Sequence, residues 1–199
     1  SDTALDAAST GNLGAVLIKA GDINAAQEML IKGIELAKLA GDCFGESAGL
    51  GFLSQALLEL GDTNGAENRA REALNLAVAT DHHFLMTRAI GHLAAVAAAE
   101  GLAERAIRLA AAGDSVRRQA GLEGDDIWFG PGWTPRLQRM RDILGLQESA
   151  RVWEAGSQLT VYQAADVALA EQSRTGPQST SIVQPSQSSL KRSLASRPR

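Results

Sequence analysis

Three stretches of the chain align with one another at a constant spacing of 40 residues, without a gap. The matching positions carry the same small or apolar residue in all three copies: Gly11, Gly51 and Gly91; Leu13, Leu53 and Leu93; Gly21, Gly61 and Gly101; Ala26, Ala66 and Ala106. A repeat of this length is typical of solenoids, in which each supersecondary unit packs against the next. The repeat therefore indicates the architecture of the chain clearly, but it gives little information about a ligand.

Each copy is predicted to form two antiparallel helices. In the first copy, apolar residues recur at helical spacing on both sides of a break at Gly21-Asp22. Gly21 can adopt the left-handed conformation that ends a helix, and Asp22 or Asn24 can accept hydrogen bonds from the free amides of the next helix. The second copy repeats this break, and there Glu67 follows Asn64 by three residues, as in a capping box. Helices of the second and third copies are expected at residues 46–60, 64–79, 84–100 and 103–120.

The segment after the repeats departs from the period and is predicted to be a structured loop. It contains three aromatic residues within six positions, Trp128, Phe129 and Trp133. Because aromatic side chains favour burial, we expect them to pin the loop against the last hairpin and to fill the core of a capping element. A ligand pocket formed by the same residues is the alternative.

The last apolar stretches predict a helical cap. Thr134-Pro135 is a typical N-cap and first position of a helix that Gly145 closes. A short helix is expected near residues 148–155, and another from Thr160 to about Gln172.

These elements predict an all-α fold, a right-handed α-solenoid of antiparallel helical hairpins with a C-terminal helical cap. Three hairpins occupy residues 1–120, the aromatic and glycine-rich loop residues 121–133, and the capping helices residues 134–172. Residues 173–199 form a basic tail rich in Ser, Gln and Pro, a composition that predicts disorder.

Charge is distributed unevenly along the chain. The whole chain carries −4 and the tail contributes +5, so the residues before the tail carry −9. An acidic body gives no reason to expect nucleic acid or an anionic membrane as the partner of the whole chain. No apolar run reaches the roughly 18 residues of a membrane span, and no signal segment opens the chain.

The single cysteine, Cys43, excludes an intramolecular disulfide and favours a reducing, cytoplasmic location. The chain opens at Ser1, directly in a helix-compatible pattern. We interpret it as a fragment of a longer protein.

No motif predicts catalysis, and we expect no enzyme activity, metal site or cofactor. The sequence lacks a GxxxxGK[ST] phosphate loop. His82 and His83 are adjacent, a spacing that does not direct two imidazoles at one metal ion, so we interpret them as a polar helix start. We expect His92 to be exposed or capped and Cys43 to serve in packing.

The hairpins resemble tetratricopeptide repeats. The first copy follows the order of residues in that family with Leu13-Gly14, Leu17, Gly21, Ala26, Leu30, Gly33 and Ile34. The second copy keeps Leu53, Leu57, Gly61, Ala66, Ala73 and Leu74, whereas the third keeps Leu93, Gly101 and Ala106 but has Gly113-Asp114 at the last pair. The usual period of the family is about 34 residues, so a spacing of 40 implies longer helices, as in the repeats of bacterial regulators.

The stretch 103–170 is similar to the C-terminal end of large bacterial LuxR-type and related signal-transduction ATPases. The similarity includes arginine-bearing helices and the run from Ala150 to Gly156. In those proteins a nucleotide-binding module precedes a helical repeat sensor or scaffold, which implies a role in transcription regulation or signal transduction. No recognisable helix-turn-helix follows Leu169, so we do not expect this fragment to bind DNA directly.

The tetratricopeptide resemblance also implies a groove, because in that family the first helix of each hairpin lines a concave face. The family's inward positions fall on small and mostly apolar residues, which suit an amphipathic helix of a protein or peptide partner. Alternatively, the helices after Thr134 or a second copy of the chain cover these positions. They are Ala8, Gly11, Ala15, Ile18 and Lys19; Ala48, Gly51, Gln55, Leu58 and Glu59; and Arg88, Gly91, Ala95, Ala98 and Ala99.

The leading hypothesis is a non-enzymatic protein–protein interaction or sensor scaffold, the C-terminal part of a larger bacterial transcriptional or signalling regulator. One alternative is a homodimerisation module that uses the exposed first helices or the terminal hairpin. The other is a small-ligand-binding accessory domain with a pocket near Trp128 and Trp133.

Overall fold

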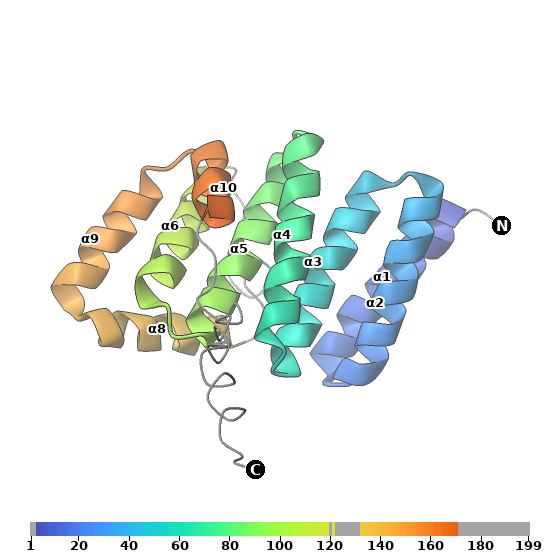
Figure 1. The fold of residues 1–199 in the computed structure, drawn as a ribbon, viewed down its shortest axis with the longest axis horizontal. Coiled ribbons are helices and arrows are strands. Elements are labelled where there is room, and N and C mark those ends of the chain that lie inside the picture. Colours follow the sequence, from blue (N-terminus) through green and yellow to red (C-terminus); the bar gives the residue numbers. More distant parts are fainter. Residues whose placement is uncertain (1–2, 120, 122–131, 171–199) are drawn as a thin grey trace, which may run out of the picture.

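The computed structural model describes residues 3–119, 121 and 132–170, which form nine α-helices packed in sequence order (Figure 1). The all-α fold and its arrangement in helical hairpins are thus confirmed. Trp128, Phe129 and the predicted tail lie outside the described residues. Within the described ranges, no helix has both the length and the apolar character needed to cross a membrane. The helices, labelled as in Figure 1, are α1 (Thr3–Ala20), α2 (Ile23–Ala40), α3 (Cys43–Glu59), α4 (Thr63–Ala79), α5 (His83–Ala99), α6 (Ala103–Gln119), α8 (Trp133–Leu144), α9 (Leu146–Ser157) and α10 (Val161–Ala170).

One residue in the left-handed conformation ends each of the first six helices, and these residues recur every 20 positions. Glycine adopts this conformation without the steric penalty that a side chain brings. Because the turns are equally spaced, α1 to α6 all have 17 or 18 residues, and positions 40 residues apart are structurally equivalent. The positive φ angles are 82° at Gly21, 67° at Gly41, 83° at Gly61, 53° at Asp81, 74° at Gly101 and 67° at Gly121.

Aspartate caps the helix that follows three of these turns. Asp22, Asp42 and Asp62 each accept a hydrogen bond from the backbone N–H three residues later, at 3.3, 2.9 and 2.8 Å. Of the two predicted capping residues, Asp22 and Asn24, Asp22 is the N-cap of α2. Helix α3 begins at residue 43 rather than 46 because Asp42 is its cap. The capping box predicted from Asn64 and Glu67 is wrong, because Asp62 occupies the N-cap position of α4.

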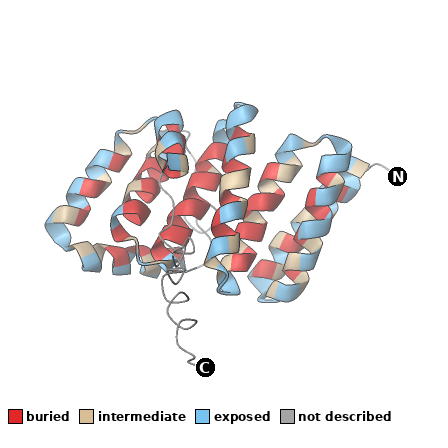
Figure 2. Cartoon of the chain, in the orientation of Figure 1, coloured by how far each residue is buried: buried red, intermediate tan, exposed pale blue. Residues whose placement is uncertain are grey.

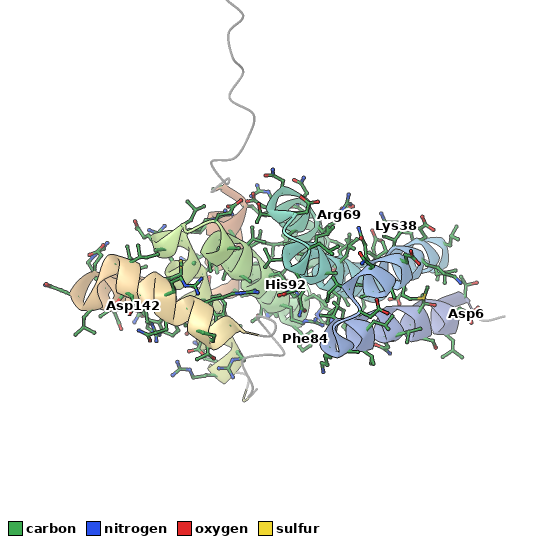
Figure 3. All side chains as sticks on the ribbon, turned by 90° about the horizontal axis from the view of Figure 1, so that it is seen from below. Asp6, Lys38, Arg69, Phe84, His92 and Asp142 are labelled. Carbon is green, nitrogen blue, oxygen red and sulfur yellow. The ribbon has the colours of Figure 1, made fainter. Side chains whose placement is uncertain are left out.

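Two layers of helices run through the stack. The hairpins α1–α2, α3–α4 and α5–α6 pack in series, and the second helix of each hairpin packs against the first helix of the next. Helices α1, α3 and α5 also contact one another in a row, which α8 continues against α5. We call the surface of α1, α3 and α5 the inner face, and that of α2, α4 and α6 the outer face. Figure 3 shows Phe84 on the inner side and Lys38 and Arg69 on the outer side.

Small residues at equivalent positions allow the helices to approach closely. Ala26, Ala66 and Ala106 are fully buried. Gly33 packs against the backbone of α1, where an added Cβ would lie 3.0 Å from the amide nitrogen of Gly11. Figure 2 shows the buried residues concentrated in α5 and α6, so the third hairpin forms the centre of the core.

Helices α8 and α9 cover the end of the third hairpin. Helix α9 packs on α6 as α3 packs on α2 and α5 on α4. The contact requires Gly156, because an added Cβ would collide with the carbonyl oxygen of Arg108. Helix α8 begins at Trp133, directly after a glycine with a φ of 72°, so the prediction of Thr134 as N-cap is wrong. Pro135 lies in the first turn instead, where its missing N–H is not needed.

The third copy differs from the other two at its last residue pair, Gly113-Asp114, and contacts within α6 account for the aspartate. Asp114 is buried in α6, where it accepts hydrogen bonds from Arg117 at 2.5 Å and from Arg118. Burial raises the pKa of the Asp114 carboxyl, but the hydrogen bonds from Arg118 and Arg117 outweigh it and hold the pKa below its ordinary value. The carboxylate is therefore ionised and paired within its own helix, and α6 continues to Gln119.

Helix α10 packs against α4, α5 and α6 and is held by a charge network. The buried side chains of Glu67 and Arg105 form an ion pair at 3.0 Å. Arg105 also donates to the carbonyl oxygen of Ala168 at 3.4 Å, and Arg71 donates to the carbonyl oxygens of Ala168 and Leu169. The two arginines satisfy the last carbonyls of α10 and oppose the negative end of its dipole, while Glu67 balances their charge.

The first turn of α10 is fixed on the opposite side of the network. The Tyr162 hydroxyl donates to Asp81 and lies 2.7 Å from Nε2 of His83. Both partners stand where α4 turns into α5. Both ends of α10 are thus attached to the second and third hairpins.

We expect the Arg105→Met variant to lose about 3 kcal/mol of unfolding free energy, because it leaves the Glu67 carboxylate buried without its closest partner. Urea denaturation followed by circular dichroism measures the loss. Arg71→Met is the matched control: its guanidinium is more exposed and lies 3.8 Å from Glu67, so its removal should cost about 1 kcal/mol or less. Equal losses in the two variants would contradict a network centred on Arg105.

Candidate functional site

The structure divides the predicted groove into an open part and a closed part. In the third copy, Gly91, Ala95 and Ala98 are buried, and α8 packs against the same helix. This part of the prediction is wrong, because no partner can reach these positions, whereas Arg88 remains half-buried and Ala99 exposed. In the first two copies, Ala8, Lys19 and Glu59 are exposed, Gly11, Ala15, Ala48, Gln55 and Leu58 are half-buried, and Ile18 and Gly51 are buried.

Helices α3 and α5 bring together an aromatic group on the inner face. The ring of Phe44 lies 5.3 Å from that of His82 and stacks with Phe84 at 6.5 Å between centroids. Phe44 and Phe84 stand at equivalent positions in the first turns of their helices, and both rings are exposed. Together with Phe52 and Arg88 they form what we call the aromatic–Arg88 cluster.

Arg88 is the charged member of this cluster. Its guanidinium carbon lies 4.4 Å from the ring centroid of Phe52 and 6.0 Å from that of Phe84, within the range of cation–π attraction. Burial lowers the pKa of Arg88 to about 10, so the group stays protonated at neutral pH. Its Nε has no hydrogen-bond partner, and no carboxylate pairs with it among the described residues. A half-buried cation without a counter-ion favours an incoming acidic group.

His92 lies one helical turn beyond Arg88 and is buried, so the expectation of an exposed or capped residue is wrong. Its Nε2 has no hydrogen-bond partner within the described part of the chain and faces Gly51, where an added Cβ would lie 2.9 Å away. Burial, and to a smaller extent the charge of Arg88, lower the pKa of His92 to about 3. The neutral ring therefore fills the contact between α3 and α5.

The remaining residues that the sequence singled out lie apart from the cluster or at its edge. Cys43 is exposed, so its predicted packing role is wrong. Trp133 is buried at the start of α8, and His82 and His83 stand where α5 begins. The described residues contain no group of three His, Cys, Asp or Glu side chains placed to hold a metal ion.

Two cavities bear on the small-ligand hypothesis. A cavity of about 10 Å³ beside His92 and Gly51 has room for no more than one water molecule. A cleft of about 740 Å³ lies between α8 and α9, where the Arg141 guanidinium carbon is 4.8 Å from the ring of Trp153. Trp133 does not line this cleft. The cleft therefore differs from the pocket predicted near Trp128 and Trp133.

The sequence did not lead us to predict that the residues of the aromatic–Arg88 cluster lie together, although the repeat contains a pattern that indicates it. Phe44 and Phe52 in α3 are eight residues apart, on one helix face, as are Phe84 and His92 in α5. The two stripes occupy equivalent positions of adjacent repeats. An alignment of these two pairs of residues, in place of the family's inward positions, would have predicted that Arg88 lies beside the phenylalanines.

The buried His92 predicts a pH dependence of stability. Its pKa is lower in the folded chain than the ordinary 6.5, so the unfolded chain binds more protons below pH 6.5 and stability falls as the pH drops toward 3. The unfolding free energy then changes by up to about 1.4 kcal/mol per pH unit. Urea denaturation between pH 6.5 and 5, above the main titration of carboxylates, measures it. The His92→Leu variant should lack this slope, and an unchanged slope in the variant would contradict the assignment.

Comparison with known proteins does not assign the chain to a family. The chain matches no protein-family model, and no curated protein shows significant similarity to it. The geometry of the described residues therefore carries the functional argument.

Proposed function

We propose that this chain is a non-enzymatic protein-binding scaffold, a right-handed solenoid of tetratricopeptide-like hairpins that holds a segment of a partner protein on its inner face. The aromatic–Arg88 cluster is the observation that carries the proposal. Phe44 and Phe84 expose apolar rings on adjacent hairpins, and Arg88 beside them lacks a carboxylate partner among the described residues. Exposed aromatic residues and arginine are the side chains most enriched at the energetic centres of protein interfaces.

The chemistry of the cluster defines the partner segment. An apolar or aromatic side chain would cover the Phe44 and Phe84 rings, and an aspartate or glutamate one turn away would pair with Arg88. The open part of the inner face continues from the cluster over the small residues Ala48 and Ala15. An amphipathic helix with an acidic residue on its apolar edge fits this surface.

The biological setting that we propose follows the resemblance to LuxR-type and related signal-transduction ATPases. The chain would be the C-terminal sensor or interaction region of a larger bacterial regulator, located in the cytoplasm. Binding on the inner face would shift the equilibrium of an upstream nucleotide-binding module through the helical stack. The chain itself would act by binding, without a cofactor and without contacting DNA.

Selection of peptides from a displayed random library on the full chain tests this proposal. We expect the selected sequences to combine an acidic residue with an aromatic or aliphatic one. The Arg88→Met variant, which removes the guanidinium but keeps an unbranched aliphatic side chain, should bind them at least about tenfold more weakly in fluorescence anisotropy. The matched control is Arg139→Met, an exposed arginine of α8 far along the chain. Equal affinity of the wild-type and Arg88→Met chains would contradict the proposal.

A second candidate function, homodimerisation through the terminal hairpin, is favoured by exposed apolar residues on α1. Leu13 and Val16 are 48% and 59% exposed, whereas their equivalents in α5, Leu93 and Val96, are 0% exposed. Helices α3 and α5 each pack against the second helix of the preceding hairpin, and their residues equivalent to Leu13 and Val16 are buried. The α1 face thus has the chemistry of a helix–helix contact but no covering helix among the described residues.

The solution mass of the full chain, measured by light scattering over a concentration series, tests this candidate. A dimer that becomes a monomer when Leu13 and Val16 are both replaced by Glu would support it. The control is Leu39→Glu, an exposed residue of α2, which should leave the mass unchanged. A monomer at every concentration would contradict it.

A further inference from the structure

The outer face contains two grooves at equivalent places in the repeat, and α10 fills one of them. The first helices of adjacent hairpins contact each other, but α2 and α4 lack comparable contacts, as do α4 and α6. The outer side is therefore open between hairpins. Helix α10 contacts both α4 and α6 and lies over α5, so it occupies the second of these openings (Figure 1).

The first opening, between α2 and α4, is a groove of about 420 Å³. Its floor is formed by Leu50, Leu53 and Leu57 of α3, and Ile31 and Ile34 of α2 form one wall. Ile31 is 42% exposed and presents its aliphatic side chain at the wall of the groove. We call this opening the α2–α4 groove.

The repeat shows that the α2–α4 groove corresponds to the groove of α10. Three of its lining residues are Gln27, Ile31 and Gly65. Adding the 40-residue period leads to Glu67, Arg71 and Arg105, the side chains that hold α10 in place. The α2–α4 groove is therefore the same structural site one repeat earlier, with a different chemistry on its walls.

We propose that the α2–α4 groove binds an amphipathic helix of a partner protein, which lies on the outer face as α10 does. The equivalence with the α10 groove supplies the shape, since that opening demonstrably takes a helix of ten residues. The occupant presents leucine-sized side chains at positions i, i+3 or i+4, and i+7, because leucines form the floor of the groove and isoleucines form one wall. This site is separate from the inner face and does not depend on its function.

The charges of the groove define the direction of the bound helix. The carbonyl end of α10 is held by Arg71 and Arg105, but their equivalents Ile31 and Gly65 carry no donor. The cations that line the α2–α4 groove are Lys38, near the opposite end of α2, and Arg69 of α4. They lie 3.8 and 2.5 Å from the Glu72 carboxylate that they share, and Lys38 also lies 3.6 Å from Glu46. A helix whose last carbonyls meet Lys38 gains from its dipole. The partner helix therefore runs in the direction opposite to α10.

A labelled peptide tests the proposal on the full chain. The probe is a fluorescein-labelled peptide with the sequence of residues 158–172, carrying Ala164→Leu and Ala168→Leu to supply larger side chains. We expect saturable binding in fluorescence anisotropy, and at least about tenfold weaker binding by the Ile31→Glu variant, which places a charge on the groove wall. Leu39→Glu is the matched control, because Leu39 is 80% exposed on the same helix and does not line the groove.

Three results would overturn the proposal. The first is no binding, or equal binding by the wild-type and Ile31→Glu chains while circular dichroism shows both folded. The second is a loss of binding in Arg71→Met but not in Ile31→Glu, because the probe would then be replacing α10 in its own groove. The third is binding only after Leu190→Asp and Leu194→Asp, which would show that the chain's own C-terminal segment covers the groove. If the Arg88→Met variant binds the probe with wild-type affinity, the α2–α4 groove binds the probe independently of the inner face.

Discussion

The left-handed turn that recurs every 20 residues is the constraint on which the rest of this structure depends. Five of the six turn residues are glycine, and the sixth, Asp81, has a φ of 53°. Each turn reverses the chain after a helix of nearly constant length, and an aspartate then caps the next helix at three of the turns. Constant helix length gives every hairpin the same faces, so the repeat in sequence becomes a repeat in space.

Equivalent faces of different hairpins differ in chemistry because a few equivalent positions carry different residues. On the inner face, a pair of first-turn phenylalanines and one arginine convert a plain helical surface into the aromatic–Arg88 cluster. On the outer face, Arg71 and Arg105 hold α10 in one groove, whereas the equivalent positions of the preceding groove carry Ile31 and Gly65, which have no donor side chain. The stack thus offers two chemically distinct surfaces on its opposite faces, one with a cation that has no carboxylate partner among the described residues and one mainly aliphatic.

The hairpins, their turns and the cap at Asp22 could be predicted from the sequence, because each depends on residues that are neighbours along the chain. The errors concern contacts between distant segments. Glu67 has the spacing of a capping-box residue, yet its partner is Arg105, 38 residues away. His92 has polar chemistry but is buried, because α3 passes it at Gly51. Ala95 is likewise buried in α5, against which α8 packs, and the repeat does not specify the position of α8.

The central claim is that the chain is a scaffold whose inner face binds a partner segment at the aromatic–Arg88 cluster. Nuclear magnetic resonance of the full chain, with a library-selected peptide added stepwise, tests it most directly. Chemical-shift changes confined to Phe44, Phe52, Phe84 and their neighbours in α3 and α5 are the expected result. Changes centred instead on Trp153 in the cleft between α8 and α9 would contradict the account.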